Sequence, residues 1–329
     1  MKKANVEAVG SAELRAGETR VVIAPALGGK ITALEMAGRQ WLWQNDLIPA
    51  RPPTDDDPSY AESGDSGGYD ECFPTVGACT LPTWIPSYGG LVLPDHGELW
   101  SQSAAFLLET QAQSGEGSGL RATCTWHGRR MPYRFERTVF VDPAGALVLR
   151  YAVTNEGTAR LPFVWCAHPL FPLTPDTRLV LPESARVRVY TEHGIKLFGS
   201  DAEHVWPRLL TPAGVVDMSR PYDVAKRFAC KLFLDMKGGY AAIEEEGVRL
   251  EVTFDASEVP NFGLWINKRG WAPFRRKRPY VNFAFEPSIG APDTVSDALG
   301  GWNSAHWLEG GETRRWGLRW RGERLISRS

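Results

Sequence analysis

Two histidines and a glutamate stand where a side chain could move protons. His168 follows an apolar run, Glu286 ends another, and each is followed directly by a proline. A residue in that setting projects from the end of a strand on rigid backbone. His96 lies in the turn sequence PDHGE. Imidazole titrates near 6.5, and burial can raise a glutamate toward the same range. These residues are therefore candidates for general acid–base catalysis at neutral pH.

Each candidate also has a plainer interpretation. His168 could be a hydrogen-bonded structural histidine, and His96 an exposed turn residue. Glu286 could form a salt bridge to one of the many arginines, because burying an unpaired charge costs several kcal/mol. Residue type and position alone leave both interpretations open.

The elements that must position these residues are strands. Apolar and polar residues alternate over 185–190, 248–254 and 315–321, as in strands with one buried face. Residues 142–145 have the composition of a hairpin loop. Only short helices are expected, near 293–299 and 219–224. The pattern predicts an all-β fold, a large antiparallel β-sandwich with few short helices, in which 1–329 form one domain.

One segment, residues 51–68, departs from this pattern because it is nearly devoid of aliphatic side chains. We expect a long polar surface loop there. Two interpretations are open: the loop covers a cleft, or it is a disordered insertion with no role.

Composition limits the classes of partner. The 37 Lys and Arg nearly balance the 39 Asp and Glu, for a formal charge of -2. That balance supplies no global field for nucleic acid or an anionic membrane. We find no signal-like segment and no apolar run near the roughly 18 residues of a membrane span. Five cysteines without CxxC spacing indicate reduced thiols in a cytoplasmic protein.

A metal centre is not expected. No two of the six histidines lie within four residues of each other, so a zinc or iron site would need widely separated ligands.

Four motifs, taken in order, resemble the aldose 1-epimerase (galactose mutarotase-like) family. They are GGYDECFPTV (67–76), PDHGELW (94–100), WCAHPLF (165–171) and FAFEPSIGAPD (283–293). The resemblance implies the large β-sandwich of that family, its supersandwich, and interconversion of sugar anomers. An Asn-Arg pair typical of galactose mutarotases upstream of the first histidine is absent here. The resemblance therefore points to a divergent branch, with a sugar other than galactose.

Carried over by motif, the resemblance implies a role for four residues. Glu286 would be the general base and His168 the general acid. His96 would hydrogen-bond the sugar near its ring oxygen. Members of the family also hold sugar hydroxyls with an aspartate from a mid-chain strand, for which Asp235 is the nearest candidate.

Two further features could contribute to substrate binding. Sugar sites pair an aromatic face with hydrogen-bonding groups, and Trp265 is a candidate for that face, although a core role is the alternative. The basic run 275–278, which includes Arg275, precedes Glu286. Arginine forks suit phosphate or sulfonate oxygens, so Arg275 could bind a charged group on the sugar. A solvated surface loop is the alternative.

The function that these residues favour is an aldose 1-epimerase, an isomerase that opens and recloses the ring of an aldohexose or derivative. Ionised Glu286 and protonated His168 would stabilise each other's charge. No cofactor or metal is required, and the expected partner is a monosaccharide bound by a monomer or homodimer. One alternative is a glycosidase or lyase that pairs Glu71 or Glu98 with Glu286. Another is a non-catalytic sugar-binding or regulatory protein of the same fold.

Overall fold

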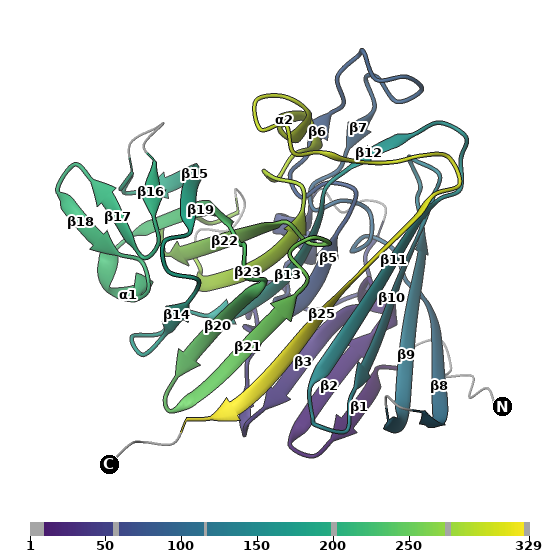
Figure 1. Cartoon of the computed structure of the whole chain (residues 1–329), viewed down its shortest axis with the longest axis horizontal. Helices are drawn as coiled ribbons and strands as arrows, with labels where there is room; N and C mark the ends of the chain where they lie inside the picture. Colours follow the sequence, from purple (N-terminus) through teal and green to yellow (C-terminus); the bar gives the residue numbers. More distant parts are fainter. Residues whose placement is uncertain (1–9, 55–58, 115–116, 199–202, 274–277, 326–329) are drawn as a thin grey trace.

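Two large antiparallel sheets face each other in the computed structural model, which describes residues 10–54, 59–114, 117–198, 203–273 and 278–325 (Figure 1). Within those ranges the larger sheet has eleven strands. In spatial order its strands are β1 (Ala12–Ala16), β2 (Thr19–Ala24), β3 (Lys30–Met36), β5 (Tyr69–Cys72), β13 (Trp165–Pro172), β23 (Val281–Ile289), β22 (Asn261–Lys268), β19 (Phe228–Asp235), β15 (Arg186–Gly194) and β16 (His204–Val205), with β4 (Arg39–Gln40) paired to β3.

The second sheet has eight strands in the described part of the chain. Its order is β14 (Arg178–Val180), β20 (Tyr240–Glu245), β21 (Val248–Phe254), β25 (Thr313–Arg324), β11 (Leu147–Asn155), β10 (Tyr133–Val141), β9 (Gly117–His127) and β8 (Ala105–Ser114). The predicted antiparallel β-sandwich is confirmed. The turn at 142–145 joins β10 to β11 as expected, and the alternation over 248–254 and 315–321 belongs to β21 and β25.

Three two-stranded sheets and several short helices lie outside the two large sheets in the described part of the chain. Three strand pairs are β6 (Cys79–Thr80) with β7 (Val92–Leu93), β12 (Leu161–Phe163) with β24 (His306–Leu308), and β17 (Arg208–Thr211) with β18 (Gly214–Asp217). The short helical elements are η1 (Pro25–Leu27), η2 (Tyr60–Gly64), α1 (Pro221–Val224) and α2 (Val295–Leu299). The two short helices expected from the sequence are therefore present as α1 and α2. No helix of the described chain is both long and apolar enough to cross a lipid bilayer.

Strand periodicity separates a core face from an outer face in the larger sheet. On β13, Trp165 and Phe171 pack into the core between the sheets, and on β23 Phe285 does the same. Side chains alternate across a strand, so His168 and Glu286 point to the opposite face, away from the second sheet. The sandwich core thus supplies a rigid backing for these two residues.

A buried ion pair lies in the core between the two sheets. Arg137 Nη1 on β10 lies 3.2 Å from Glu71 Oε1 on β5, and both side chains are buried. Tyr151 and Trp165 also donate hydrogen bonds to Glu71, at 2.9 and 3.0 Å. Both Glu71 oxygens are therefore satisfied by donors from both sheets.

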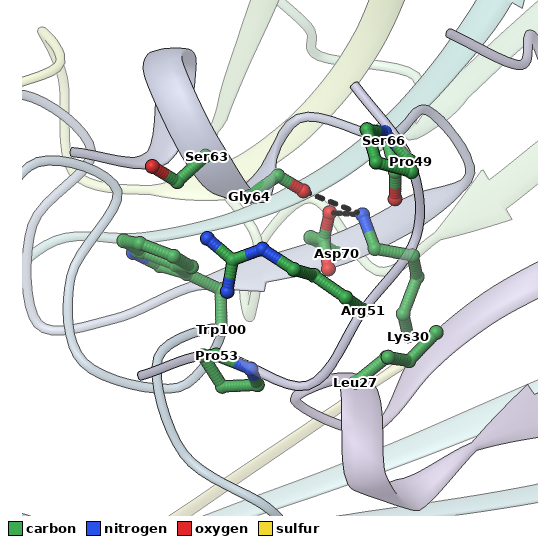
Figure 2. A pocket seen from close by; sticks show the side chains of 10 residues that line it. All are labelled: Leu27, Lys30, Pro49, Arg51, Pro53, Ser63, Gly64, Ser66, Asp70 and Trp100. Carbon is green, nitrogen blue, oxygen red and sulfur yellow. Dashed lines mark hydrogen bonds and ion pairs between the residues drawn. The ribbon is translucent and has the colours of Figure 1, made fainter. Parts of the chain in front are cut away.

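The prediction of a polar surface loop over 51–68 is wrong for the C-terminal half of that segment. Residues 55–58 lie outside the described ranges, but Tyr60, Asp65 and Ser66 are buried. Lys30 fixes this half by donating a hydrogen bond to the Gly64 carbonyl at 3.3 Å (Figure 2) and another to the Gly67 carbonyl at 2.8 Å. A buried lysine therefore anchors the backbone of this half.

Candidate active site

A cavity of about 220 Å³ opens on the outer face of the larger sheet. His168 and Glu286 line it, together with His96 from the loop after β7. Lys231, Asp293 and Trp265 also line it. Four of the six predicted site residues, Glu286, His168, His96 and Trp265, therefore meet in one cavity.

Strand register brings His168 and Glu286 together. The pairing of Cys166 with Ser288 and of Leu170 with Ala284 sets His168 across from Glu286 on neighbouring strands. His168 Nε2 lies 3.8 Å from Glu286 Oε1, which is too long for a hydrogen bond. Both side chains are buried, and neither Glu286 Oε1 nor His168 Nδ1 has a hydrogen-bond partner among the described residues. Buried polar atoms without partners are uncommon and favour a site that a ligand completes.

The other Glu286 oxygen is engaged. Lys231 on β19 donates a hydrogen bond to Glu286 Oε2, and Cys166 Sγ lies 3.5 Å from the same oxygen. Lys231 Nζ also lies 3.0 Å from Asp293 Oδ1. Gly263 makes room for this pair, since a Cβ there would lie 2.8 Å from Glu286 Oε2 and 3.0 Å from Lys231 Cε. The ammonium thus bridges two carboxylates at the edge of the cavity.

The surroundings of His168 do not favour the protonated form that was expected from the sequence. Burial lowers the pKa of His168 well below its usual value, and the positive charges of His96, Lys231 and Lys30 lower it further. Burial raises the pKa of Glu286, although Lys231 opposes that shift. Attraction between His168 and Glu286 does not dominate because Lys231 is closer to the carboxylate and supplies the positive charge. His168 is therefore neutral near pH 7.

His96 is the charged histidine of the site. Its Nδ1 lies 2.9 Å from Asp95 Oδ1. Burial disfavours the imidazolium, but nearby negative groups, with Asp95 the strongest, together outweigh that cost and raise the pKa of His96 to about 10. The His96 ring stacks on Tyr60, with centroids 4.0 Å apart and planes 19° apart, and meets the His168 ring edge-on at 5.0 Å.

A second polar network supports the stacked ring of Tyr60. Tyr60 donates a hydrogen bond to Asp70 Oδ2 at 2.7 Å. Lys30 donates to the same oxygen (Figure 2). Asp65, which also lines the cavity, has its pKa raised to about 6 by burial. Residues of the 51–68 segment therefore form one wall of the site.

Aromatic side chains form another part of the cavity lining. Trp265 lies edge-on to Trp271 with centroids 6.0 Å apart, and Trp271 lies edge-on to Tyr280 at 6.0 Å. All three line the cavity. The arrangement combines an apolar surface with carboxylate and imidazole groups, as sugar sites do.

Asp235 does not reach this cavity. It shares a strand face with Lys231 but stands four residues further along β19, where it lines a separate groove and lies 3.3 Å from Arg186. Four residues of strand span roughly 13 Å, more than an aspartate side chain can recover. The strand that was expected to contribute an aspartate contributes Lys231 instead. Arg275 lies outside the described residues.

The alternative carboxylate pairs do not form. Glu71 points into the core on the opposite face of the sheet from Glu286 and is held by Arg137. Glu98 is buried, accepts a hydrogen bond from Tyr133 at 2.9 Å, and does not line the cavity. The geometry gives no support to a glycosidase built on either residue with Glu286.

Sequence reasoning missed Lys231, Asp293 and Tyr60. Lys231 had a usable signal, because a lysine inside the apolar run FACKLFL must be paired if it is buried. Asp293 ends the FAFEPSIGAPD motif but was given no role. Tyr60 is the only aromatic residue of the 51–68 segment, and its burial depends on distant contacts. In the described ranges, no group of three or more His, Cys, Asp or Glu side chains is arranged to hold a metal ion.

Solved structures with the same fold include galactose mutarotase-like proteins. A protein from Escherichia coli K12, provisionally described as an aldose 1-epimerase, is 18% identical with a TM-score of 0.63, over 97% of this chain and 100% of that one. A galactose mutarotase related enzyme from Lactobacillus acidophilus is 14% identical with a TM-score of 0.62, over 97% and 99%. A galactose mutarotase-like protein from Clostridium acetobutylicum is 13% identical with a TM-score of 0.62, over 98% of each.

These similarities confirm the galactose mutarotase-like fold that the four motifs implied, in a sequence that has diverged far from those neighbours. No family model matches the chain, and no curated protein matches it. At these sequence identities the similarity establishes the fold but not the activity.

Proposed function

We propose that this protein is an aldose 1-epimerase that interconverts the α and β anomers of an aldohexose or a derivative. One observation carries the proposal. A carboxylate oxygen without a partner, Glu286 Oε1, lies 3.8 Å from the His168 imidazole in a cavity that His96 also borders. A hemiacetal needs a base at the C1 hydroxyl and an acid at the ring oxygen, and this site offers both kinds of group.

In the proposed reaction, Glu286 takes the proton of the C1 hydroxyl while the bond between C1 and the ring oxygen breaks. An imidazole on the other side gives a proton to the ring oxygen. Rotation about the C1–C2 bond then presents the other face of the aldehyde, and the two proton transfers reverse. The protein ends in its starting state. Each general catalyst typically contributes about 100- to 10,000-fold.

The size and lining of the cavity support a single sugar ring. Its volume of about 220 Å³ is below the roughly 300–1,000 Å³ of pockets for drug-sized ligands. The aromatic lining, which includes Trp265 and Trp271, suits the apolar C–H patches of a pyranose. His168 Nδ1 and Glu286 Oε1 would find partners in the sugar hydroxyls.

Lys231 sets the pH range of the proposed base. Burial raises the pKa of Glu286 and Lys231 opposes that rise, so Lys231 favours the ionised carboxylate. Since the base acts only when ionised, kcat falls as the pH drops through the pKa of Glu286. The acid acts only when protonated, so kcat also falls at high pH, and the profile is bell-shaped.

A second candidate, sugar binding without catalysis, is favoured by one observation. Lys231 engages Glu286 Oε2 and so weakens the carboxylate as a base. In this reading, the same cavity would bind a sugar without accelerating anomer exchange.

Polarimetry of freshly dissolved α-glucose, α-galactose and other single-anomer aldoses tests the proposal. We expect the wild type to accelerate equilibration of at least one aldose. Glu286→Gln should lose the acceleration while still binding that sugar in calorimetry. Sugar binding without acceleration in the wild type would establish the second candidate instead. Release of monosaccharide from oligosaccharides would point to a glycosidase.

A further inference from the structure

We propose that the pair formed by Asp95 and His96 is the proton donor to the sugar ring oxygen, with His168 acting as a neutral hydrogen-bond partner. This inference rests on the proposed epimerase function and reverses the roles that the motifs implied for the two histidines. The argument compares the surroundings of the two imidazoles, which lie side by side at the cavity.

His96 has the hydrogen bonding of an oriented acid. Its Nδ1 is bound to Asp95 Oδ1 at 2.9 Å, which leaves Nε2 to face a ligand. No other hydrogen bond joins the His96 ring to the part of the chain that the structure describes. The His96 side chain is 19% exposed against 8% for His168, so His96 is the more accessible of the two rings. A carboxylate on one nitrogen fixes the ring and stabilises its protonated form.

The backbone holds His96 in one place. Its φ of 56° lies in the left-handed region, which a non-glycine residue adopts only when its surroundings demand it. Its N–H donates to the Val76 carbonyl at 2.6 Å. The next residue must be glycine, because a Cβ on Gly97 would lie 2.1 Å from the Phe73 carbonyl oxygen. The imidazole is therefore presented to the cavity by a rigid turn and stacked on Tyr60.

His168 has the opposite setting. Its Nε2 is 3.8 Å from Glu286, beyond hydrogen-bond range, and no described side chain accepts a hydrogen bond from its Nδ1. Lys231 already neutralises Glu286, and His96 lies 5.0 Å away, ring to ring. Two imidazoles this close do not both carry a charge readily, and the carboxylate partner belongs to His96.

The charged and titratable groups around His96 come from four segments. Asp95 belongs to its own turn, and the others are Tyr60, Asp65, Cys72 and His168. Against the opposing effect of burial, nearby negative groups led by Asp95 raise the pKa of His96 to about 10, whereas burial and the nearby cations lower that of His168. The electrostatics thus agree with the geometry.

The proposed step conserves protons and electrons. As the bond between C1 and the ring oxygen breaks, its electron pair stays on the ring oxygen, which takes the proton from His96 Nε2. Glu286 holds the proton of the C1 hydroxyl, so C1 becomes an aldehyde. On reclosure, the new ring-oxygen bond forms at the other face, His96 regains its proton and Glu286 returns the other. Asp95 is a positioning residue and stays ionised throughout.

Asp95→Asn is the decisive variant because it keeps the side-chain shape and removes the charge. We expect the alkaline limb of the kcat profile to move down by at least about one pH unit, since a neighbouring opposite charge typically shifts a pKa by 1–3 units. The matched control is Glu156→Gln, which removes a similar carboxylate from the exposed His127, at 3.3 Å. The control should leave the profile unchanged.

Nitrogen-15 NMR of the imidazoles provides a readout that does not depend on turnover. At pH 8 we expect His96 as the imidazolium and His168 as the neutral ring in the wild type. A charged His168 with a neutral His96 would overturn the inference. So would an alkaline limb that Asp95→Asn leaves in place in an active, folded enzyme. A wild type that interconverts no anomers would instead overturn the proposed function, and this inference with it.

Discussion

Glu71 and Glu286 are two buried carboxylates on opposite faces of the same sheet, and they differ in how their oxygens are satisfied. Glu71 faces the core, where Arg137, Tyr151 and Trp165 engage both of its oxygens. Glu286 faces the cavity, where Lys231 engages one oxygen and the other has no partner in the described chain. Burial raises the pKa of both, to about 7 for Glu71.

The comparison shows that a perturbed pKa does not by itself identify a functional carboxylate. Burial is the largest cause of the raised pKa in both cases. They differ in how many oxygens are satisfied: both oxygens of Glu71 accept hydrogen bonds, whereas Glu286 Oε1 has no partner in the described chain. The same substitution at the two positions should therefore affect different quantities.

The largest expected effect is on catalysis. Glu286→Gln keeps the shape of the side chain and removes the base, so kcat for anomer exchange should fall by about 100- to 10,000-fold. Stability should change little, because Lys231 keeps its contact with Asp293. Polarimetry of a freshly dissolved anomer gives kcat, and thermal unfolding gives Tm. A large fall in Tm with kcat retained would reverse the roles of the two glutamates.

The second prediction is the same change in the core. Glu71→Gln leaves the guanidinium of Arg137 buried without its counter-charge, and breaking such a pair typically costs about 3–5 kcal/mol. We expect the free energy of unfolding in urea to fall by that amount while kcat of the folded protein is kept. A folded variant of normal stability but without activity would contradict this assignment.

The third prediction concerns the partner of Glu286. Lys231→Met removes the charge that lowers the pKa of Glu286, so that pKa should rise and the acid limb of kcat should move to higher pH by about 1–3 units. The control is Arg186→Met, which removes a cation from the exposed Asp235. An unmoved acid limb in Lys231→Met would mean that Glu286 is not the base.

A smaller effect is expected at the glycine beneath the ion pair. Gly263→Ala places a methyl group 2.8 Å from Glu286 Oε2, so the carboxylate must shift. Misplacing a catalytic group by about 1 Å can cost up to about 100-fold, and we expect a fall in kcat of roughly 10- to 100-fold. Gly301→Ala is the control, since nothing lies within 4 Å of a Cβ there. Equal kcat values in Gly263→Ala and Gly301→Ala would contradict the prediction.

The smallest effect is expected at Asp235. Because it lies outside the cavity and pairs with an exposed arginine, Asp235→Asn should leave KM unchanged and alter stability by no more than about 0.5 kcal/mol. A clear rise in KM would show that Asp235 does contribute to sugar binding.

Local patterns predicted much of the fold. Alternation over 248–254 has the same period in the structure as in the sequence, because each strand there has one buried face. The order of the strands was not predictable from such patterns. β13 pairs with β5 and β23, which are far from it in the sequence, and period-2 alternation says nothing about which strands pair.

The candidate site was predictable where a residue carried its own signal. His168 and Glu286 each end an apolar run before a proline, and register then brings them together. Lys231 was missed because its role depends on a glycine on the next strand and a carboxylate one strand further. The lowered pKa of His168 was not anticipated either, since a pairwise argument with Glu286 omits burial and the cation on the far side of that carboxylate. Such arrangements exist only in three dimensions.

Exchange NMR of aldoses at anomeric equilibrium tests the central claim most directly, because it reports ring opening without a coupled assay. We predict α-to-β exchange of at least one aldose at a rate proportional to protein concentration. That rate should be lost in Glu286→Gln and kept in Asp235→Asn. Enzyme-dependent exchange that persists at the wild-type rate in folded Glu286→Gln, or is absent for every aldose in the wild type, would contradict the account.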